Sequence, residues 1–309
     1  MSDLTTYQEA LKKASSAIDL LIAENERLKH REPIAIIGMG CRLPGGGNSP
    51  EEYWSLLSEG RDAVSPIPAE RWTASRFFSE DHEASGKMYI AEGGFLDISP
   101  YDFDTRFFGI SPKEARALDP QQRLLLEIAW EALEDAGINP ASLMGSPTGV
   151  FVGISSSDFE SAHIHSDQLS LIDAYSMTGI TFSTAAGRIS YTLGLEGPSF
   201  PVDTACSSSL VALHLACRSL REGECDLALV GGVNLMLAPE PLIAGSKLRA
   251  LSPEGRCKTF DASANGYGRG EGCGMLVLKR LETAHRDGDQ VLALIKGSAI
   301  NNDGRSNGL

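Results

Sequence analysis

The chain has 309 residues, of which 42% are hydrophobic and 22% are charged, a composition typical of a packed globular protein. Its formal net charge of −14 disfavours binding to a phosphate backbone or to an anionic membrane surface. No apolar run approaches the roughly 18 residues of a membrane-spanning helix, and the N-terminus lacks the features of a signal peptide. The sequence therefore predicts a cytoplasmic protein that binds neither nucleic acid nor membrane.

Within residues 1–31, Leu4 to Lys29 follow a heptad pattern, in which apolar spacings of three and four alternate along one helical seam. The seam positions a and d hold Leu4, Tyr7, Leu11, Ala14, Ile18, Leu21, Asn25 and Leu28. Asn25 at position a favours a parallel two-stranded coil, because paired amides can hydrogen-bond across the seam. We expect a homodimeric coiled coil. A single amphipathic helix lying on its own domain is the alternative, since the seam lasts under four heptads.

Beyond residue 32, short apolar segments alternate with helical periodicity, which predicts an α/β layered architecture. Strands are expected at 34–37, 150–152, 200–202, 227–230, 274–278 and 291–295, and a helix at 210–220. Two more helices are expected to begin at Pro112 and Pro120. Each has an N-cap residue before the proline and a capping-box partner after it, namely Ser111 with Glu114 and Asp119 with Gln122.

The six cysteines include no C-x-x-C pair, so no metal site is expected. Cys206 differs from the others because it follows a predicted strand and precedes a predicted helix. A helix N-terminus stabilises a thiolate, and its unpaired N–H groups can hold a developing oxyanion. Two alternatives remain open: a cysteine that merely packs, and a serine nucleophile within 207–209, although the G-x-S-x-G elbow of hydrolases is absent.

The segment around Cys206 resembles the active-site signature of ketosynthases from modular polyketide synthases. It reads Asp203-Thr204-Ala205-Cys206-Ser207-Ser208-Ser209. Four other segments agree in the same order: EPIAIIGMGCRLPGG at 32–46, LDPQQRL at 118–124, AGRISY at 186–191 and YGRGEG at 267–272. The similarity runs from about Glu32 to Leu309. The N-terminal coil is similar to the docking segments that precede such domains.

This resemblance implies a thiolase-like fold of five layers, αβαβα, built from two similar halves and assembled as a homodimer. Residues 1–31 would form the docking coil, 32–285 the N-terminal half of the ketosynthase and 286–309 the start of its C-terminal half. The expected activity is that of a β-ketoacyl synthase. Cys206 would accept an acyl chain from the phosphopantetheine of an acyl carrier protein and condense it with a decarboxylated malonyl-type extender, without a directly bound cofactor. The coil would bind the C-terminal docking segment of an upstream synthase subunit.

The resemblance also implies two catalytic histidines, located in the second half of the domain beyond Leu309. None of the six histidines present matches them, so the chain alone is expected to be inactive in condensation. A dimerising docking module is therefore an alternative function, and a degradative thiolase is a third hypothesis, disfavoured by the coil and the cysteine signature. The glycines within 266–274 are expected to let the backbone approach the site, with Glu271 and Asp261 supporting it from behind.

Overall fold

A computed structural model describes residues 7, 11–16, 18–21, 32–164, 170 and 172–305. These residues form a mixed six-stranded sheet in the order β5–β4–β6–β7–β1–β8. The strands are β1 (Ile34–Arg42), β4 (Thr148–Gly153), β5 (Ser199–Val202), β6 (Leu227–Asn234), β7 (Gly272–Arg280) and β8 (Ala293–Ile295). β4 is parallel to β5 and β6, whereas β7 is antiparallel to β6 and β1, and β8 is antiparallel to β1. A separate ribbon pairs β2 (Ser65–Pro66) with β3 (Glu92–Gly93).

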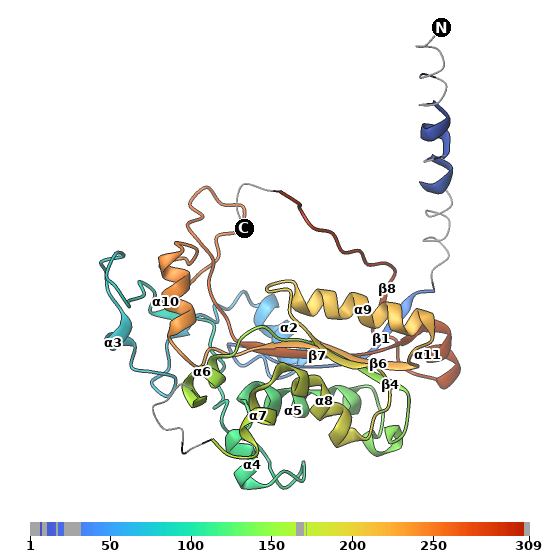
Figure 1. The fold of residues 1–309 in the computed structure, drawn as a ribbon, viewed down its shortest axis with the longest axis horizontal. Coiled ribbons are helices and arrows are strands. Elements are labelled where there is room, and N and C mark those ends of the chain that lie inside the picture. The colour runs from blue at the N-terminus through green and yellow to red at the C-terminus, as the bar shows by residue number, and fades with distance from the viewer. Residues whose placement is uncertain are drawn as a thin grey trace.

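Helices cover both faces of the sheet (Figure 1). On one face pack α5 (Pro120–Asp135) and α8 (Phe182–Leu193), with α4 (Pro112–Ala117) and α7 (Ser176–Ile180) beyond them. On the opposite face, α9 (Ser208–Glu222) lies across β4 and β6. The connections contain α2 (Pro50–Ser58), α3 (Ala74–Phe77), η1 (Pro140–Leu143), α6 (Asp158–Ile164), α10 (Glu240–Lys247) and α11 (Leu281–Asp287).

Two apolar clusters hold these layers together. Val150 and Val152 of β4 belong to the cluster beneath α5 and α8, whereas Phe151 belongs to the cluster beneath α9. This division follows from the strand geometry, in which successive side chains point to opposite faces. Every residue of β4 is buried, as expected of a parallel strand covered on both faces. The packing on both faces consequently fixes the position of the carboxyl end of β4.

The predicted strands and helices are present, with different boundaries. β1 continues to Arg42, five residues beyond its predicted end at Ile37. Ser111 and Asp119 cap α4 and α5 as predicted, because each side chain accepts a backbone N–H from the first helical turn, at 3.1 and 2.8 Å. Within the described ranges, no helix is long and apolar enough to cross a membrane.

The predicted capping-box partners are wrong, because both side chains bond to distant segments. Glu114 accepts a hydrogen bond from Arg188 Nη1 at 2.7 Å instead of reaching back to its own cap. The Gln122 amide donates to the carbonyl of Gly179 at 3.0 Å and to Thr184 Oγ1 at 3.1 Å. These tertiary bonds tie α7 and α8 to the starts of α4 and α5.

Gly179 of α7 provides a strong test of this packing. A Cβ at this position would lie 1.9 Å from the carbonyl oxygen of Ala117, and a backbone atom cannot rotate away as a side chain can. Gly179→Ala should therefore lower the free energy of unfolding by about 2–4 kcal/mol, measured by urea denaturation. Gly187→Ala in α8 is the matched control, because nothing lies within 4 Å of its added Cβ. Equal losses in both variants would contradict the packing described.

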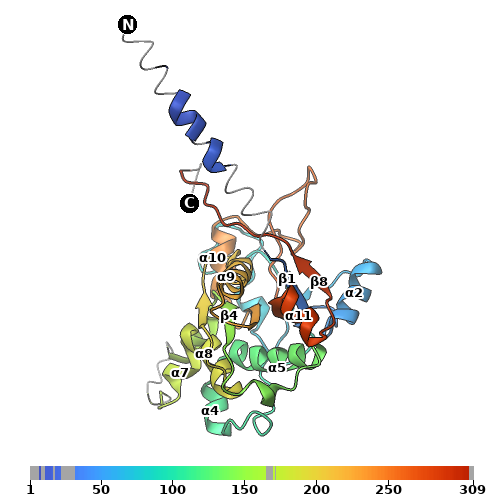
Figure 2. The ribbon, with the colours of Figure 1, turned by 90° about the vertical axis from the view of Figure 1, so that its right-hand side faces the viewer.

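Part of the segment predicted to form the N-terminal coil lies within the described residues. Residues 11–16 and 18–21 are helical, and Figures 1 and 2 show these turns standing clear of the sheet and its covering helices. Leu11, Ile18 and Leu21 of the predicted seam are 66%, 55% and 69% exposed. The seam positions Leu4, Asn25 and Leu28 lie outside the described residues. The described seam residues thus present apolar side chains to solvent.

Candidate active site

Cys206 lies in the turn between β5 and α9. The preceding Ala205 has a φ of 54°, in the left-handed region that residues with a side chain seldom adopt. Hydrogen bonds hold this conformation: the Ala205 N–H donates to Asp203 Oδ1 at 3.0 Å and the Thr204 N–H donates to Ser208 Oγ at 2.9 Å. The Ser208 hydroxyl donates to the Ala205 carbonyl at 2.6 Å. The turn is therefore rigid, and the Cys206 side chain that it presents is exposed.

Two glycines let the first turn of α9 approach the sheet closely. A Cβ on Gly153, at the end of β4, would lie 2.6 Å from the backbone nitrogen of Ser209. A Cβ on Gly232 of β6 would lie 2.8 Å from the Cβ of Ser209. Larger residues would displace the helix start, and Cys206 with it. The helix N-terminus, which favours negative charge, is consequently held beside Cys206 and the ends of both strands.

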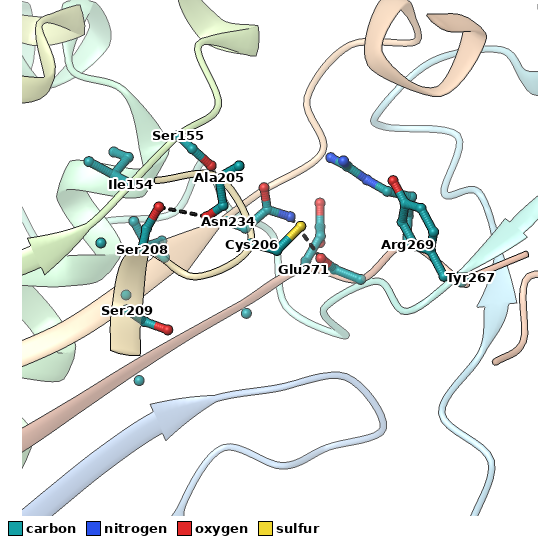
Figure 3. A pocket seen from close by; sticks show the side chains of 17 residues that line it. Ile154, Ser155, Ala205, Cys206, Ser208, Ser209, Asn234, Tyr267, Arg269 and Glu271 are labelled. Atoms are coloured by element: carbon teal, nitrogen blue, oxygen red, sulfur yellow. Dashed lines mark hydrogen bonds between the residues drawn. The ribbon is translucent and has the colours of Figure 1, made fainter. Parts of the chain in front are cut away.

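A cavity of about 570 Å³ opens beside Cys206. Its walls come from Ile154 and Ser155 after β4, from Asn234 at the end of β6, and from the segment 267–272 that leads into β7. Figure 3 shows Cys206 between the turn that carries Ala205 and the segment that carries Tyr267 and Arg269. The prediction that the glycine-rich segment approaches the site is confirmed.

A buried ion pair supports this segment from behind. The Glu271 carboxylate accepts hydrogen bonds from Arg71 Nε and Nη2, both at 3.0 Å, and both side chains are fully buried. The same carboxylate accepts the backbone N–H groups of Leu96 and Met236, both at 3.0 Å. Glu271 thus ties three loops together, as predicted. Asp261 does not take part, because it is exposed and its carboxylate bonds within its own turn.

A second buried network lies behind the loops after β4 and β6. The Gln121 amide donates to the Ser156 carbonyl at 3.0 Å and to Asp119 Oδ2 at 3.2 Å. Its oxygen accepts the Ser156 hydroxyl at 3.0 Å and the Leu235 N–H at 3.2 Å. Burial, with a further contribution from the nearby Asp158 carboxylate, raises the pKa of Asp119 to about 6. Asp119 is therefore an acidic group that folding removes from water.

Asp119 should make stability depend on pH. Its folded pKa of about 6 exceeds the ordinary 3.8, so between roughly pH 4 and 6 the folded chain keeps a proton that the unfolded chain releases. The stability contributed by this group is present at low pH and falls as pH rises, by about 3 kcal/mol for a shift of about two units. The free energy of unfolding of Asp119→Asn, minus that of the unmodified chain, should rise by that amount between pH 4 and pH 7, as measured by urea denaturation. Asp261→Asn, which changes an exposed carboxylate with a lowered pKa, should show no such rise, and a pH-independent difference for Asp119→Asn would contradict the assignment.

The other candidate nucleophiles differ from Cys206 in their surroundings. Cys217, Cys225 and Cys273 are buried, and burial raises the pKa of each thiol. Cys257 is exposed, but it does not line the cavity, and its sulfur accepts the backbone N–H of Gly268 at 3.3 Å.

The serines and histidines near Cys206 do not form a hydrolase-like pair. The Ser207 hydroxyl donates to the Thr204 carbonyl at 2.8 Å, and the Ser208 hydroxyl donates to that of Ala205. Among the described residues, none that lines the cavity is a histidine, and His214 Nδ1 lies 2.9 Å from Ser298 Oγ. Across all the residues that the structure describes, no group of three or more histidine, cysteine, aspartate or glutamate side chains is placed to hold a metal ion.

The family described as "Beta-ketoacyl synthase, N-terminal domain" matches residues 31–284. One subunit of the phenolphthiocerol/phthiocerol polyketide synthase of Mycobacterium tuberculosis is 52% identical over 310 residues, which cover 100% of this chain and 14% of that protein. Another subunit of the same synthase, from the same organism, is 55% identical over 284 residues, 92% of this chain and 18% of that protein.

Solved ketosynthases share the fold. The oxazolomycin ketosynthase domain of Streptomyces albus superimposes with a TM-score of 0.85 at 39% identity, over 90% of this chain and 47% of that one. The ketosynthase from module 6 of the bacillaene synthase of Bacillus subtilis gives 0.78 at 42% identity, over 90% and 45%. The thiolase-like architecture is therefore present. The chain spans less than half of these structures and less than a fifth of the curated relatives.

Proposed function

Because the chain belongs to the β-ketoacyl synthase family, among the ketosynthase domains of modular polyketide synthases, we propose that Cys206 is its acyl-accepting nucleophile. The observation that carries this proposal is the rigid turn that holds an exposed thiol at the N-terminus of α9, beside a cavity. A helix N-terminus favours the thiolate, which is the reactive form. The test is transfer of an acyl group from a pantetheine thioester to this residue.

In the proposed first step, the acyl donor is the phosphopantetheine thioester of an acyl carrier protein. The Cys206 thiolate attacks the carbonyl carbon of this thioester. A new carbon–sulfur bond forms to Cys206 as the carrier's sulfur leaves with its electron pair and takes up a proton. The product is an acyl-enzyme, the covalent intermediate of a two-step transfer.

In the proposed second step, a malonyl-type extender on a carrier protein loses CO₂. The electron pair of the broken carbon–carbon bond passes to the α-carbon, which attacks the Cys206 thioester and releases the Cys206 thiolate. We propose that the two histidines used by the family for this step come from outside these 309 residues, and that the chain alone loads an acyl group without extending it. The histidine-free lining described above and the half-length coverage of solved ketosynthases support this view.

We also propose that residues 1–31 form a parallel homodimeric coil that docks the C-terminal segment of an upstream synthase protein. The exposed seam side chains support this, because a second copy of the seam would bury them. Residues 32–285 would be the N-terminal half of the ketosynthase, in keeping with the family match to 31–284. Residues 286–309 would begin the second half, which contributes β8 as the neighbour of β1.

Cysteine crosslinking tests the coil. Leu21→Cys places a thiol at a d position, where two parallel copies bring the same residue together. It should form a covalent dimer on oxidation, seen on a non-reducing gel. Ser16→Cys is the matched control, since this residue occupies the helical face opposite the seam and should crosslink little. The unmodified chain measures the background from its own exposed cysteines, and no dimer at Leu21→Cys above that background would count against the coil.

A further inference from the structure

Arg269 is a cation that lines the Cys206 cavity. Its Nε is buried and makes no hydrogen bond, and no ion pair within the described ranges includes it. Neighbouring arginines are paired: Arg71 binds Glu271, and Arg42 binds Glu131. A buried donor without an acceptor costs free energy, so this position indicates an acceptor that arrives from outside the chain.

The backbone around Arg269 is fixed, so its side chain enters the cavity from a defined position. The Arg269 carbonyl accepts the N–H of Gly94 at 2.9 Å, and the Glu271 N–H donates to the Gly94 carbonyl at 2.7 Å. The Asn234 amide donates to the Gly270 carbonyl at 2.7 Å. The buried Glu271 side chain anchors the segment two residues further along, as described above. A group held in this way can recognise a ligand with little loss of backbone entropy.

The surroundings of the guanidinium are polar and open to a ligand. Arg269 lines the Cys206 cavity and also an adjoining hollow of about 280 Å³, which contains the serines at 155–157. Figure 3 shows its side chain directed from the segment 267–272 towards the side of the cavity that carries Ser155 and Ala205. Asp158 also lines the hollow, but its carboxylate accepts the N–H of Leu237 at 3.1 Å and forms no ion pair with Arg269. The two side chains still interact electrostatically, while the Arg269 Nε stays without a hydrogen-bond acceptor.

We propose that Arg269 binds the carboxylate of the malonyl-type extender and thereby distinguishes it from the acyl group loaded in the first step. This inference rests on the proposed function. Both substrates are thioesters of a phosphopantetheine arm. The free carboxylate of the extender is what distinguishes it from the acyl group. A guanidinium binds a carboxylate with two parallel charge-assisted hydrogen bonds. The phosphate of the arm is also an anion, but a buried Nε that lines the same cavity as the Cys206 thiol matches the reacting end of the substrate.

The proposed interaction belongs to the ground state of the extender. The negative charge that Arg269 would hold passes to the α-carbon as neutral CO₂ leaves, so the contact does not strengthen as the reaction proceeds. Arg269 is accordingly a specificity and positioning residue. In the complete synthase, its removal should raise the KM for the extender far more than it lowers kcat, because the contact is made when the extender binds.

Protection of Cys206 from alkylation tests the inference on the chain itself. The protein carries Cys257→Ser, so that the other exposed thiol is absent, and iodoacetamide modification of Cys206 is followed by peptide mass spectrometry. The probes are the amide analogues of malonyl-pantetheine and acetyl-pantetheine, which cannot acylate the thiol and carry no phosphate. The malonyl probe should protect at a concentration about tenfold lower than the acetyl probe. Arg269→Gln should abolish this preference, and Arg269→Lys should restore part of it.

Two controls make the outcome decisive. Arg218→Gln changes an exposed arginine of α9 that pairs with Glu222, and it should keep the full malonyl preference. The methyl ester of the malonyl probe is neutral and should behave as the acetyl probe on the unmodified protein, a comparison that needs no substitution. Equal protection by malonyl and acetyl probes, or a preference that survives Arg269→Gln, would overturn the inference. Loading of an acyl group on Cys206 would still be observed in that case, so the proposed function would stand.

Discussion

Incubation of the intact chain with an acyl-pantetheine thioester should add the mass of one acyl group, and Cys206→Ala should add none. The sulfur of Cys206 is the atom that the proposed transfer acylates, so its removal leaves no acceptor in the cavity. Intact-protein mass spectrometry gives the stoichiometry, and peptide mapping locates the group. Cys257→Ser is the matched control: it removes the other exposed thiol, which lies outside the cavity lining, and it should be acylated as fully as the unmodified chain.

Two other results would change the interpretation. Acyl mass that persists in Cys206→Ala, mapped to residues 207–209, would establish a serine as the acceptor. No acyl mass on the unmodified chain would favour the alternative that it serves as a docking module, for which the exposed seam of residues 11–21 is the supporting observation. The experiment therefore separates an enzyme from an interaction protein.

Arg71→Met should lower the free energy of unfolding by about 3–5 kcal/mol, because it leaves the Glu271 carboxylate buried without its cation. The two remaining hydrogen bonds, from the backbone N–H groups of Leu96 and Met236, do not neutralise this charge. Urea denaturation at neutral pH measures the loss.

Arg218→Met provides the comparison, since it breaks an exposed pair with Glu222 on the surface of α9 and should cost about 0.5 kcal/mol or less. A loss for Arg71→Met no greater than for Arg218→Met would mean that Glu271 becomes hydrated or protonated at little cost. The charge pair would then not be what fixes the segment at 267–272.

Local patterns were sufficient to predict the six strands of the main sheet and the helices α4, α5 and α9. Short runs of apolar residues located the strands. Ser111 and Asp119 marked the starts of α4 and α5, because capping depends on neighbours within one helical turn. The predicted partners Glu114 and Gln122 failed because tertiary bonds to α7 and α8 replaced the local ones. A capping box and a tertiary contact use the same residue types, so spacing alone cannot separate them.

The candidate site was predicted only in part. The motif around Cys206 and the glycine-rich segment were visible, whereas the pairing of Arg71 with Glu271 joins residues 200 positions apart and leaves no local signal. Gly153 and Gly232 also escaped notice, since their role depends on α9 lying against both strands. Arg269 stood within a recognised motif, yet the lack of a hydrogen-bond acceptor at its Nε is a property of the folded surroundings.

The position of β1 in the sheet has a consequence for synthesis on the ribosome. Its neighbours are β7 and β8, and Ile34 pairs with Arg280 and Ile295 near the other end of the described chain. At roughly 5–20 residues per second, β1 leaves the exit tunnel about 12–50 s before its first neighbour. During that time its apolar residues have no sheet to join, so the nascent chain depends on β4, β5 and β6 to assemble first. Such long-range closure is slow, and until it occurs the unpaired first strand exposes apolar residues that favour aggregation.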